Sequence, residues 1–535
     1  MKPTLAKKLS FSLLTSVLIL SGCTPVGPEF QGVTPPPLPK AWQQHTKQSN
    51  TALLRWWHTF HDPTLNTLVQ KAYTQNLDIQ SAGLRIAQAR MALGIAQGFA
   101  FPQIQTLSGQ ASSTRTGLTD VAAAGINFDM GWEMDLWGKY ARSIEAGEAQ
   151  LYATVASYDA IMVSVIAEVA RNYINYRTAQ ERLIYAKRNV VIQERVTKMT
   201  QIQFQSGNVS ELDMQQARTQ LYNTRTTIPA IELTRIQARN ALALLLATDA
   251  SRLEKLLGTQ HIKLHDSATR YIGKHKGIVQ INTHQNGLIG SHLIPKATLN
   301  PYYKIDASLL TRRPDIKVAE YTVHAQNARI GVETAALYPS FSLFGNIGYN
   351  TNNASGSWLS GKEALGVTIG PSFSWNIFQY GRIKNKIRLQ DALFEESLVN
   401  YNKRVLSAVA EVSNALHGYL LTKAQQKENQ KAVEATIRAF NISIVQYNDG
   451  LVNYQRLLTT VEKLTTTQDR YATIRGNVAL SVVALYKALG GGWQSRRGKA
   501  YISKETAQKM KGRIDWGKYL NPSMTTLPKG FENDQ

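Results

Sequence analysis

The sequence predicts a mixed α and β membrane protein that is internally duplicated, with a few β-strands for the membrane and long coiled-coil helices beyond it. Three observations lead to this prediction. Motifs recur at a long and nearly constant interval, short segments alternate between apolar and polar residues, and two segments of about sixty residues keep a helical apolar period without a proline.

The duplication is visible as pairs of matching motifs. Asn76 and Asp78 recur 237 positions later as Arg313 and Asp315. Further on, glycines that precede or end the long helical segments recur 243 positions later, as Gly138 with Gly381 and Gly207 with Gly450. This interval is too long for a solenoid and indicates a duplicated half-domain. We place the first repeat at 63–258 and the second at 309–493.

The first residues are typical of an exported lipoprotein. A basic start and an apolar stretch at 9–20, too short to span a bilayer, predict a signal peptide at 1–22. Cys23, the only cysteine of the chain, follows small residues as in a lipobox. We expect it to carry diacylglycerol and to open a lipidated segment at 23–62; the alternative is a simple signal with a chance cysteine. Thr24, instead of an aspartate that retains lipoproteins at the inner membrane, predicts the outer membrane.

The chain is strongly basic. Its formal net charge is +23, and loss of Lys2, Lys7 and Lys8 with the signal peptide lowers it to +20. Such an excess of basic residues can favour binding to nucleic acid or to an anionic membrane surface. Because the signal peptide predicts export, nucleic acid is not an expected partner. Because no run of five basic residues occurs, the charge is spread over exposed helix faces. It forms either a solvated surface or a contact with outer-membrane lipid.

Alternating segments supply the predicted membrane strands, since no stretch of eighteen apolar residues follows the signal peptide. Apolar residues alternate with small or polar ones over 126–136, 341–349 and 365–377, and less regularly from Gln103 onward. Gly/Ser/Thr/Asn-rich loops at 112–119 and 350–361 join these strands in pairs.

A soluble sandwich gives the same alternation, so the residues on each face decide between the two. One face carries aromatic residues suited to lipid, and the other carries acids suited to a wet lumen: Asp129, Glu133 and Asp135. Four antiparallel strands per chain cannot close a barrel, and open strand edges are not tolerated in lipid. We therefore expect a homotrimer with a twelve-stranded transmembrane β-barrel.

Between the strand pairs run long helical patterns. Residues 141–204 and 382–447 contain no proline and one internal glycine each, which predicts rods of roughly 90–100 Å. Each rod turns at a glycine, where positive φ costs little, and a second helix returns over 211–247 or 454–489. Shorter helices at 63–98 and 313–336 lead into the strands and stop at Pro102 and Pro339.

The sequence resembles a known family, the TolC-like outer membrane factors, and within this family the lipoprotein subgroup. The matching strings run in order from Cys23 to Trp493: CTPVGPEF, RWWHTFHDPTLNTLV, GWEMDLWGK, LLTRRPDIKVAE, FSWNIFQYGRI and LYKALGGGW. The resemblance implies a homotrimer whose barrel lies in the outer membrane of a Gram-negative bacterium and whose helical barrel fills the periplasm. It also implies a passive exit duct for drugs and other small molecules, docked to a periplasmic adaptor and to a proton- or ATP-driven inner-membrane transporter.

The helix turns lie farthest from the strands and predict the periplasmic tip, where the adaptor would make contact. The residues of the two turns are Gly207, Asn208, Val209, Ser210, Gly450, Leu451 and Val452. In the family, carboxylates just past the turns close the resting channel. Asp213 matches this pattern, whereas Arg456 and Thr459 depart from it. We expect Asp213, Arg456 and Tyr447 at the gate. Arg456 either pairs with Asp213 or points to solvent.

Other features of the sequence say less about function. Glu168 and Glu411, at matching positions, are interpreted as exposed helix-face charges or caps. His261 and His265 lack the glutamate of a zinc-protease motif, so we expect no metal, no cofactor and no enzyme. The connector at 259–308 resembles the family's equatorial segment, and the basic tail at 494–535 either adds to it or stays partly disordered. Two alternative functions remain: a conduit for type I protein secretion, and a structural outer membrane lipoprotein.

Overall fold

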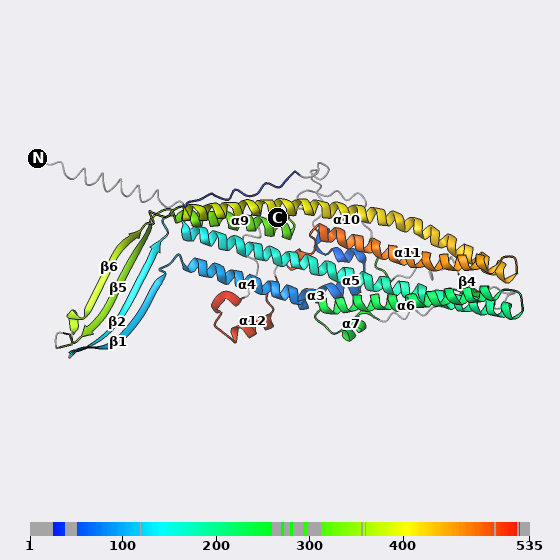
Figure 1. Ribbon diagram of the computed structural model, residues 1–535, viewed down its shortest axis with the longest axis horizontal. Helices are drawn as coiled ribbons and strands as arrows, with labels where there is room; N and C mark the ends of the chain where they lie inside the picture. Colours follow the sequence, from blue (N-terminus) through cyan, green and yellow to red (C-terminus); the bar gives the residue numbers. More distant parts are fainter. Residues whose placement is uncertain are drawn as a thin grey trace.

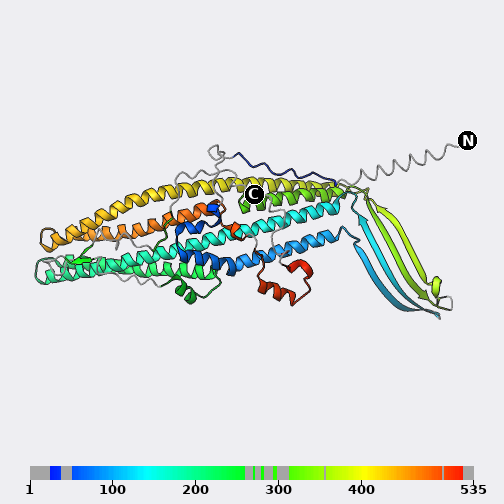
Figure 2. The ribbon, with the colours of Figure 1, turned by 180° about the vertical axis from the view of Figure 1, so that it is seen from behind.

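The structure is a computed structural model of the chain, and it joins a four-stranded sheet to a long helical rod (Figures 1 and 2). Cys23, the signal peptide and most of the connector lie outside the residues that it describes. Those residues are 25–37, 51–117, 119–258, 269–271, 279–281, 293–297, 312–354, 357–358, 360–496, 499–521 and 524.

The same order of elements occurs twice along the chain. The first set is α4 (Leu77–Gly98), β1 (Ile104–Thr116), β2 (Thr119–Met134), α5 (Lys139–Gln205) and α6 (Glu211–Leu245). The second set is α9 (Pro314–Ala335), β5 (Ser340–Asn352), β6 (Leu365–Ser374), α10 (Arg382–Asn448) and α11 (Tyr454–Ala488). Helices α5 and α10 have 67 residues each, and α6 and α11 have 35 each. These equal lengths match the repeat seen in the sequence.

Shorter elements flank these two sets. They are α2 (Thr51–Leu54), η2 (Trp56–Phe60), α3 (Pro63–Gln75), α7 (Ala250–Leu257), β3 (Thr269–Tyr271), β4 (Val279–Ile281), η4 (Gly361–Glu363), η5 (Trp493–Arg496), α12 (Lys504–Lys511) and η6 (Gly517–Leu520).

The sheet is antiparallel throughout, in the order β1-β2-β5-β6. Its register separates the two predicted faces, since Phe128 pairs with Ile347 on one face and Asp129 pairs with Asn346 on the other. The apolar face is exposed, with Ile369 at 72% and Phe373 at 70%. Strands β1 and β6 are open edges of the described sheet.

Three strand boundaries differ from the predictions. Most of the loop predicted at 112–119 belongs to β1 and β2, because serine and threonine side chains leave the backbone ladder intact. Strand β2 ends at Met134, before the predicted end at Leu136. Strand β6 ends at Ser374, before the predicted end at 377, since the next partner on β5 would be Pro339, which has no N–H to donate.

The helix predicted at 63–98 is two helices, broken at Asn76. The backbone of Asn76 is extended, its side chain accepts from the Ile79 N–H at 3.0 Å, and its Nδ2 donates to the Leu245 carbonyl at 2.9 Å. Asn76 thus caps α4 and also receives the end of α6. Its counterpart Arg313 donates to the Ala488 carbonyl at 2.5 Å, at the end of α11.

These junctions stack the shorter helices end to end, so that the described part of the chain has four helical columns. In order they are α4 with α6, then α5, then α9 with α11, and finally α10 (Figures 1 and 2). Neighbouring columns pack against each other along their length. The α4–α6 column and the α10 column are the outer ones of the protomer.

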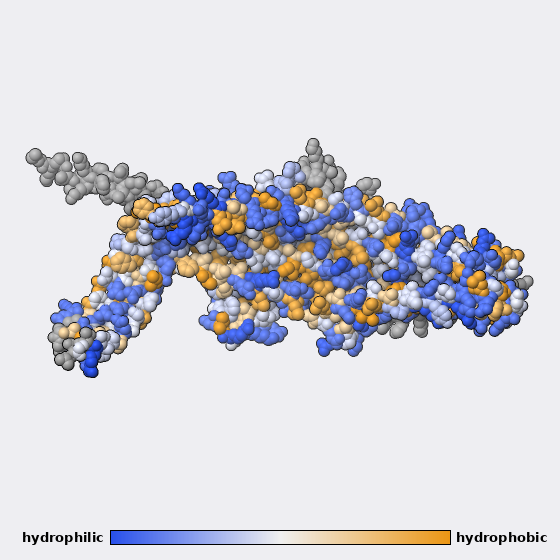
Figure 3. All heavy atoms as spheres, viewed as in Figure 1, coloured by the Kyte–Doolittle hydropathy of each residue, from blue (hydrophilic) through white to orange (hydrophobic). Residues whose placement is uncertain are grey.

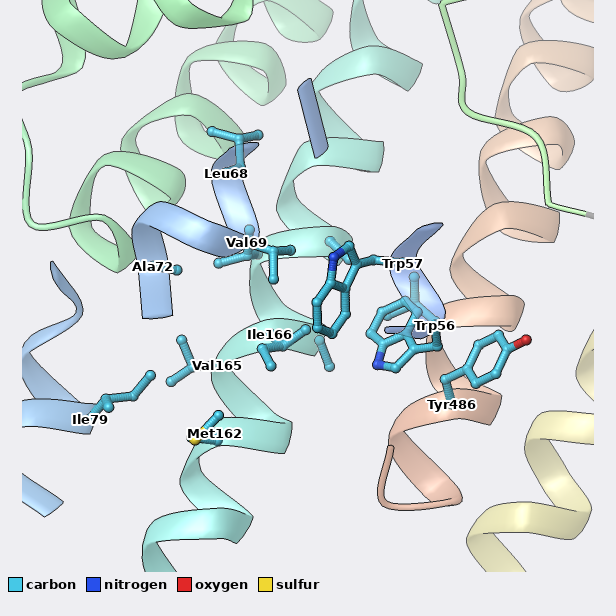
Figure 4. Packing of buried hydrophobic residues seen from close by; sticks show 14 of the residues in the cluster. Trp56, Trp57, Leu68, Val69, Ala72, Ile79, Met162, Val165, Ile166 and Tyr486 are labelled. Carbon is cyan, nitrogen blue, oxygen red and sulfur yellow. The ribbon is translucent and has the colours of Figure 1, made fainter. Parts of the chain in front are cut away.

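The main core lies at the middle of the rod, where the N-terminal and C-terminal segments meet (Figure 4). The Trp56 ring stacks on Tyr486 with centroids 5.3 Å apart, and Trp57 is also buried. Gly492, with φ +109°, lets the backbone pass close to both tryptophans. Full burial of an aromatic side chain stabilises a fold by about 1.5–3 kcal/mol, so this cluster fixes the two segments onto the helices.

Candidate functional site

The tip consists of two turns with the same geometry, 206–210 and 449–453. In the first, the Asn208 N–H donates to the Gln203 carbonyl at 2.8 Å, and in the second the Leu451 N–H donates to Gln446 at 2.8 Å. These bonds, together with glycine at φ +72° in both turns, form Schellman-type helix ends. No atom lies within 4 Å of a Cβ built on either glycine, so the backbone conformation alone requires glycine there.

The helices that leave the two turns are capped differently. Ser210 and Asp213 form a capping box at α6, in which Asp213 Oδ2 accepts from the Ser210 N–H at 3.1 Å. At α11, Asn453 accepts from the Arg456 N–H at 3.2 Å. Arg456 therefore stands in the first helical turn, where the helix dipole favours an anion and disfavours a cation.

Asp213 and Arg456 form no ion pair within the described protomer. The Asp213 carboxylate instead accepts from the backbone N–H and the hydroxyl of Ser210 in its own turn. Burial raises the pKa of Tyr454, and the nearby Tyr447 and the charge of Asp213 raise it further. Arg456 is exposed, and no ion pair of its side chain occurs among the described residues. The described residues therefore do not bring these two predicted partners together.

Tyr447 does not lie where a gate side chain would be presented. It is 3% exposed, its hydroxyl donates to Thr200 Oγ1 at 3.4 Å, and its ring meets Tyr454 edge-on at 5.7 Å. Tyr447 therefore holds α5, α10 and α11 together inside the tip. Among the turn residues, Val209 and Val452 pack against this cluster, whereas Leu451 is 73% exposed.

The three acids predicted for the lumen have different environments. Asp129 Oδ1 accepts from the Asn346 side chain at 2.6 Å and has no cationic partner among the described residues. Glu133 pairs with Lys139 at 3.1 Å and accepts from the Tyr140 hydroxyl at 2.8 Å. Asp135 lies past the end of β2, and its carboxylate accepts from a backbone N–H in the first turn of α5. Only Asp129 and Glu133 lie on the polar face of the strand.

A row of tryptophans marks the boundary between the sheet and the rod. Each donates from its indole Nε1 to a carbonyl of a helix-to-strand connection: Trp132 to Ala100, Trp137 to Pro339, and Trp375 to Leu337. Aromatic rings with a polar edge gather at membrane–water interfaces. The position of this row, where the sheet meets the rod, is typical of a membrane–water interface.

The segment 25–37, here called the N-terminal strap, is fixed to this boundary. Its Val26 N–H donates to the Trp137 carbonyl at 3.0 Å, and Asn327 donates to the Pro28 carbonyl at 3.0 Å. Phe30 stacks on His324 with centroids 4.4 Å apart. Since Pro25 packs against the boundary next to Gly138, the strap starts two residues from Cys23. Sequence reasoning missed these contacts.

An ion-pair network lies at the junction of α9 with α11. Arg313 is 4% exposed and pairs with Asp315 at 2.8 Å and with Glu411 at 2.6 Å, while Arg404 contacts Asp315. Glu168, the counterpart of Glu411, pairs with Lys487 at 3.6 Å. Glu168 and Glu411 are thus parts of networks between columns. A groove of about 730 Å³ runs beside this network.

The described residues contain no His, Cys, Asp and Glu cluster that could hold a metal ion; His261 and His265 lie outside them. Among the described helices, only α5 is long and apolar enough to cross a membrane. In the most apolar 18-residue stretch of α5, 67% of the residues are buried inside the protein, as expected of a core helix.

A model of the family described as "Outer membrane efflux protein" matches residues 68–248 and 307–491, one range on each repeat. The "Probable outer membrane lipoprotein SilC" of Salmonella typhimurium is 27% identical over 434 residues, which cover 79% of this chain and 86% of that protein. The "Solvent efflux pump outer membrane protein SrpC" of Pseudomonas putida is 27% identical over 496 residues, 89% of this chain and 97% of that protein.

Solved structures resemble the chain over nearly their whole length. The outer-membrane channel OprN superposes with a TM-score of 0.72 at 26% identity, covering 88% of this chain and 99% of its own. The CmeC outer membrane channel of Campylobacter jejuni superposes with a TM-score of 0.72 at 22% identity, over 95% of this chain and all of its own, and shows the fold alone.

Proposed function

Because this chain belongs to the outer membrane efflux protein family, we propose that it forms the exit duct of a tripartite pump. The duct is passive: an inner-membrane transporter, driven by protons or by ATP, supplies the energy, and a periplasmic adaptor connects the two. The cargo is drugs and other small molecules, and the transporter selects it. A relative named for solvent efflux supports this class of cargo.

The main support for the proposal is that the sheet and the helical rod of one chain each have two sides without a neighbour. The sheet ends in free edges at β1 and β6, and the rod ends in the α4–α6 and α10 columns. Three copies joined edge to edge supply twelve strands and twelve columns. This closure removes every strand edge from lipid, as a membrane sheet requires.

Exposed apolar side chains along the outer columns support the same closure. On α10, Val399 is 63% exposed and Leu421 is 69% exposed; on α6, Leu244 is 77% exposed. Large apolar surface of this kind marks a contact face. In the trimer, α10 of one protomer packs against the α4–α6 column of the next.

The tip is the proposed gate and adaptor contact. Asp213 of one protomer and Arg456 of its neighbour approach each other when the helical barrel closes. The turn residues face the adaptor, with Leu451 and Asn208 exposed for that contact. At the other end, Asp129 and Glu133 line the lumen of the barrel.

Deletion of the gene and complementation test this function. The deletion strain is expected to become more susceptible to a panel of small antibiotics and solvents, and the wild-type gene should restore resistance. Unchanged susceptibility together with a lost secreted polypeptide would instead assign the duct to protein secretion.

The lipid anchor has its own test. Cys23→Ser should lose all label when cells are fed a palmitate analogue, because the thioether and the new amino terminus both depend on this cysteine. Ser21→Ala, which keeps a small residue in the lipobox, should retain the label. Label that persists on Cys23→Ser contradicts lipidation at this site.

A further inference from the structure

The C-terminal tail, described over 499–521, is packed onto α4 (Figure 1). Met510 and Leu520 are 6% and 5% exposed, and Trp516 packs against the same core. A Cβ built on Gly83 would lie 2.2 Å from the Tyr501 carbonyl oxygen, so the tail touches the α4 backbone directly. The tail is thereby held in one place on the side of the rod.

The outer face of this tail is basic. Its side chains Lys504, Lys511, Arg513 and Lys518 are exposed, and none forms an ion pair among the described residues. Lys509 pairs with Glu505 at 2.7 Å. Exposed hydrophobic side chains accompany the cations, with Ile514 at 62% and Tyr519 at 37% (hydrophilic and hydrophobic residues are distinguished in Figure 3).

The tail also extends along α4 toward the sheet. Tyr501 lies beside Gly83, and the Tyr519 hydroxyl lies 3.4 Å from a Cβ built on Gly94. Gly94 is four residues from the end of α4 at Gly98, or about 6 Å along the helix axis. The tryptophan row begins just beyond. A headgroup layer extends roughly 5–8 Å past the hydrocarbon, so the Tyr519 end of the tail, next to Lys518, stands closest to headgroup depth. Tyr501, beside Gly83, lies about 22 Å from the end of α4.

We propose that this tail docks on anionic phospholipid headgroups of the leaflet that faces the rod, as a second membrane contact besides the lipid on Cys23. The inference rests on the proposed placement of the sheet in the membrane. Cations near such a surface strengthen binding by roughly fivefold each. The hydrophobic Ile514 and Tyr519 side chains fit an interface between water and acyl chains, which a soluble acidic polymer does not offer.

Lysine labelling in nanodiscs tests the proposal on the full-length protein. In discs with roughly a third phosphatidylglycerol, acetylation of Lys518 should slow by at least about threefold relative to pure phosphatidylcholine discs. Salt at about 0.5 M, where the Debye length is roughly 4 Å, should abolish the protection. Lys427 and Lys463, exposed in the half of the rod near the tip, should react equally in both discs.

A charge-reversal variant sharpens the test. Lys511→Glu with Arg513→Glu should remove the protection of Lys518, whereas Lys427→Glu with Lys463→Glu should leave it intact. Equal rates in both discs overturn the tail contact while incorporation into the discs upholds the membrane placement. Failure to incorporate overturns the proposed function itself. Protection by added peptidoglycan but not by anionic lipid assigns the basic face to that polymer and overturns the lipid contact.

Discussion

Arg456 occupies the first turn of α11, a position where a cation opposes the helix dipole by about 0.3–1 kcal/mol. The matching position of the first repeat holds Asp213, which both satisfies a cap and suits the dipole. A residue kept against local preference indicates a role outside its own helix. The role that we propose is the pair with Asp213 of the neighbouring protomer, because no such pair forms within one protomer.

The gate pair predicts a non-additive leak. Arg456→Ser should raise single-channel conductance and the entry of vancomycin, and Asp213→Asn, which keeps the cap acceptor, should do the same. An exposed pair is worth about 0–1 kcal/mol, so each change should raise the open fraction up to about fivefold. The double variant should leak no more than either single one.

The matched control is Lys463→Ser, which removes an exposed cation from the same helix further from the turn. It should leave conductance unchanged. Single variants that stay tight, or leaks that multiply in the double variant, show that the two side chains are not paired and that helix packing alone closes the tip.

The acids proposed for the lumen predict effects on ion selectivity. Asp129→Asn should lower the preference for cations, because this carboxylate has no cationic partner among the described residues. Glu133→Gln should lower it as well, by leaving Lys139 unpaired on the same face. The reversal potential across a planar bilayer under a salt gradient measures both. Glu505→Gln, on the exposed α12, is the control, and a wild-type reversal potential for Asp129→Asn refutes its place in the lumen.

For single residues, the sequence predicted the position along the chain better than the contact partner in the fold. Asp213 and Arg456 were found by counting from the turn glycines, a signal that lies along the chain. The burial of Tyr447 against Thr200 was not predictable, since the two residues stand far apart in sequence and meet only when the two hairpins pack. The contacts of the strap with Trp137 and Asn327 were missed for the same reason.

Among the elements, the end-to-end helix junctions do the most to align the columns. Asn76 closes one junction with an amide, and Arg313 closes the other with a guanidinium that is also paired to α10 through Glu411. The second junction therefore depends on charge. Its carboxylate Asp315 lies between Arg313 and Arg404. Burial raises the pKa of Asp315, but hydrogen bonds and charge from the two arginines outweigh burial and hold this pKa below its usual range.

This junction predicts a pH dependence of stability. A lowered carboxylate pKa in the folded state adds stability that is present above the unfolded pKa near 3.8 and is lost as the pH falls through the folded value. The melting temperature in detergent should therefore hold from pH 7 to about 5 and fall below about 4. Asp315→Asn should be destabilised at neutral pH by about 1–3 kcal/mol, because Arg313 and Arg404 each lose one of their two carboxylate partners and keep only Glu411.

Asp391→Asn, a change at an exposed carboxylate of α10, provides the comparison and should follow the wild-type curve. The melting temperature of Asp315→Asn should depend less steeply on pH below about 4, since its junction no longer titrates. A wild-type slope in that range would mean that other carboxylates set the acid limit.

Element types followed from the sequence, while several element ends did not. Periodicity located all four sheet strands and the long helices. The break at Asn76 was missed because asparagine interrupts a helix only where a hydrogen bond, such as the one to the Leu245 carbonyl, stabilises the extended backbone. The end of β6 was missed because it depends on which residue faces it across the sheet, and that register is not written in β6 alone.

For the whole molecule, the described part of one chain leaves edges unpaired. Its four-stranded sheet has two free edges, its rod has two outer columns without a neighbour, and large apolar side chains are exposed on these outer columns. The sequence predicted this incompleteness from the strand number alone. It left open whether the C-terminal tail packs or stays partly disordered, because the anchors Met510 and Leu520 are single apolar residues in a polar stretch.

Native mass spectrometry of the protein extracted in detergent tests the central claim most directly, because it counts the chains in one particle. The account predicts particles of three chains, which close twelve strands and twelve helical columns. A stable particle of one chain, with its edges open, would contradict the proposed duct.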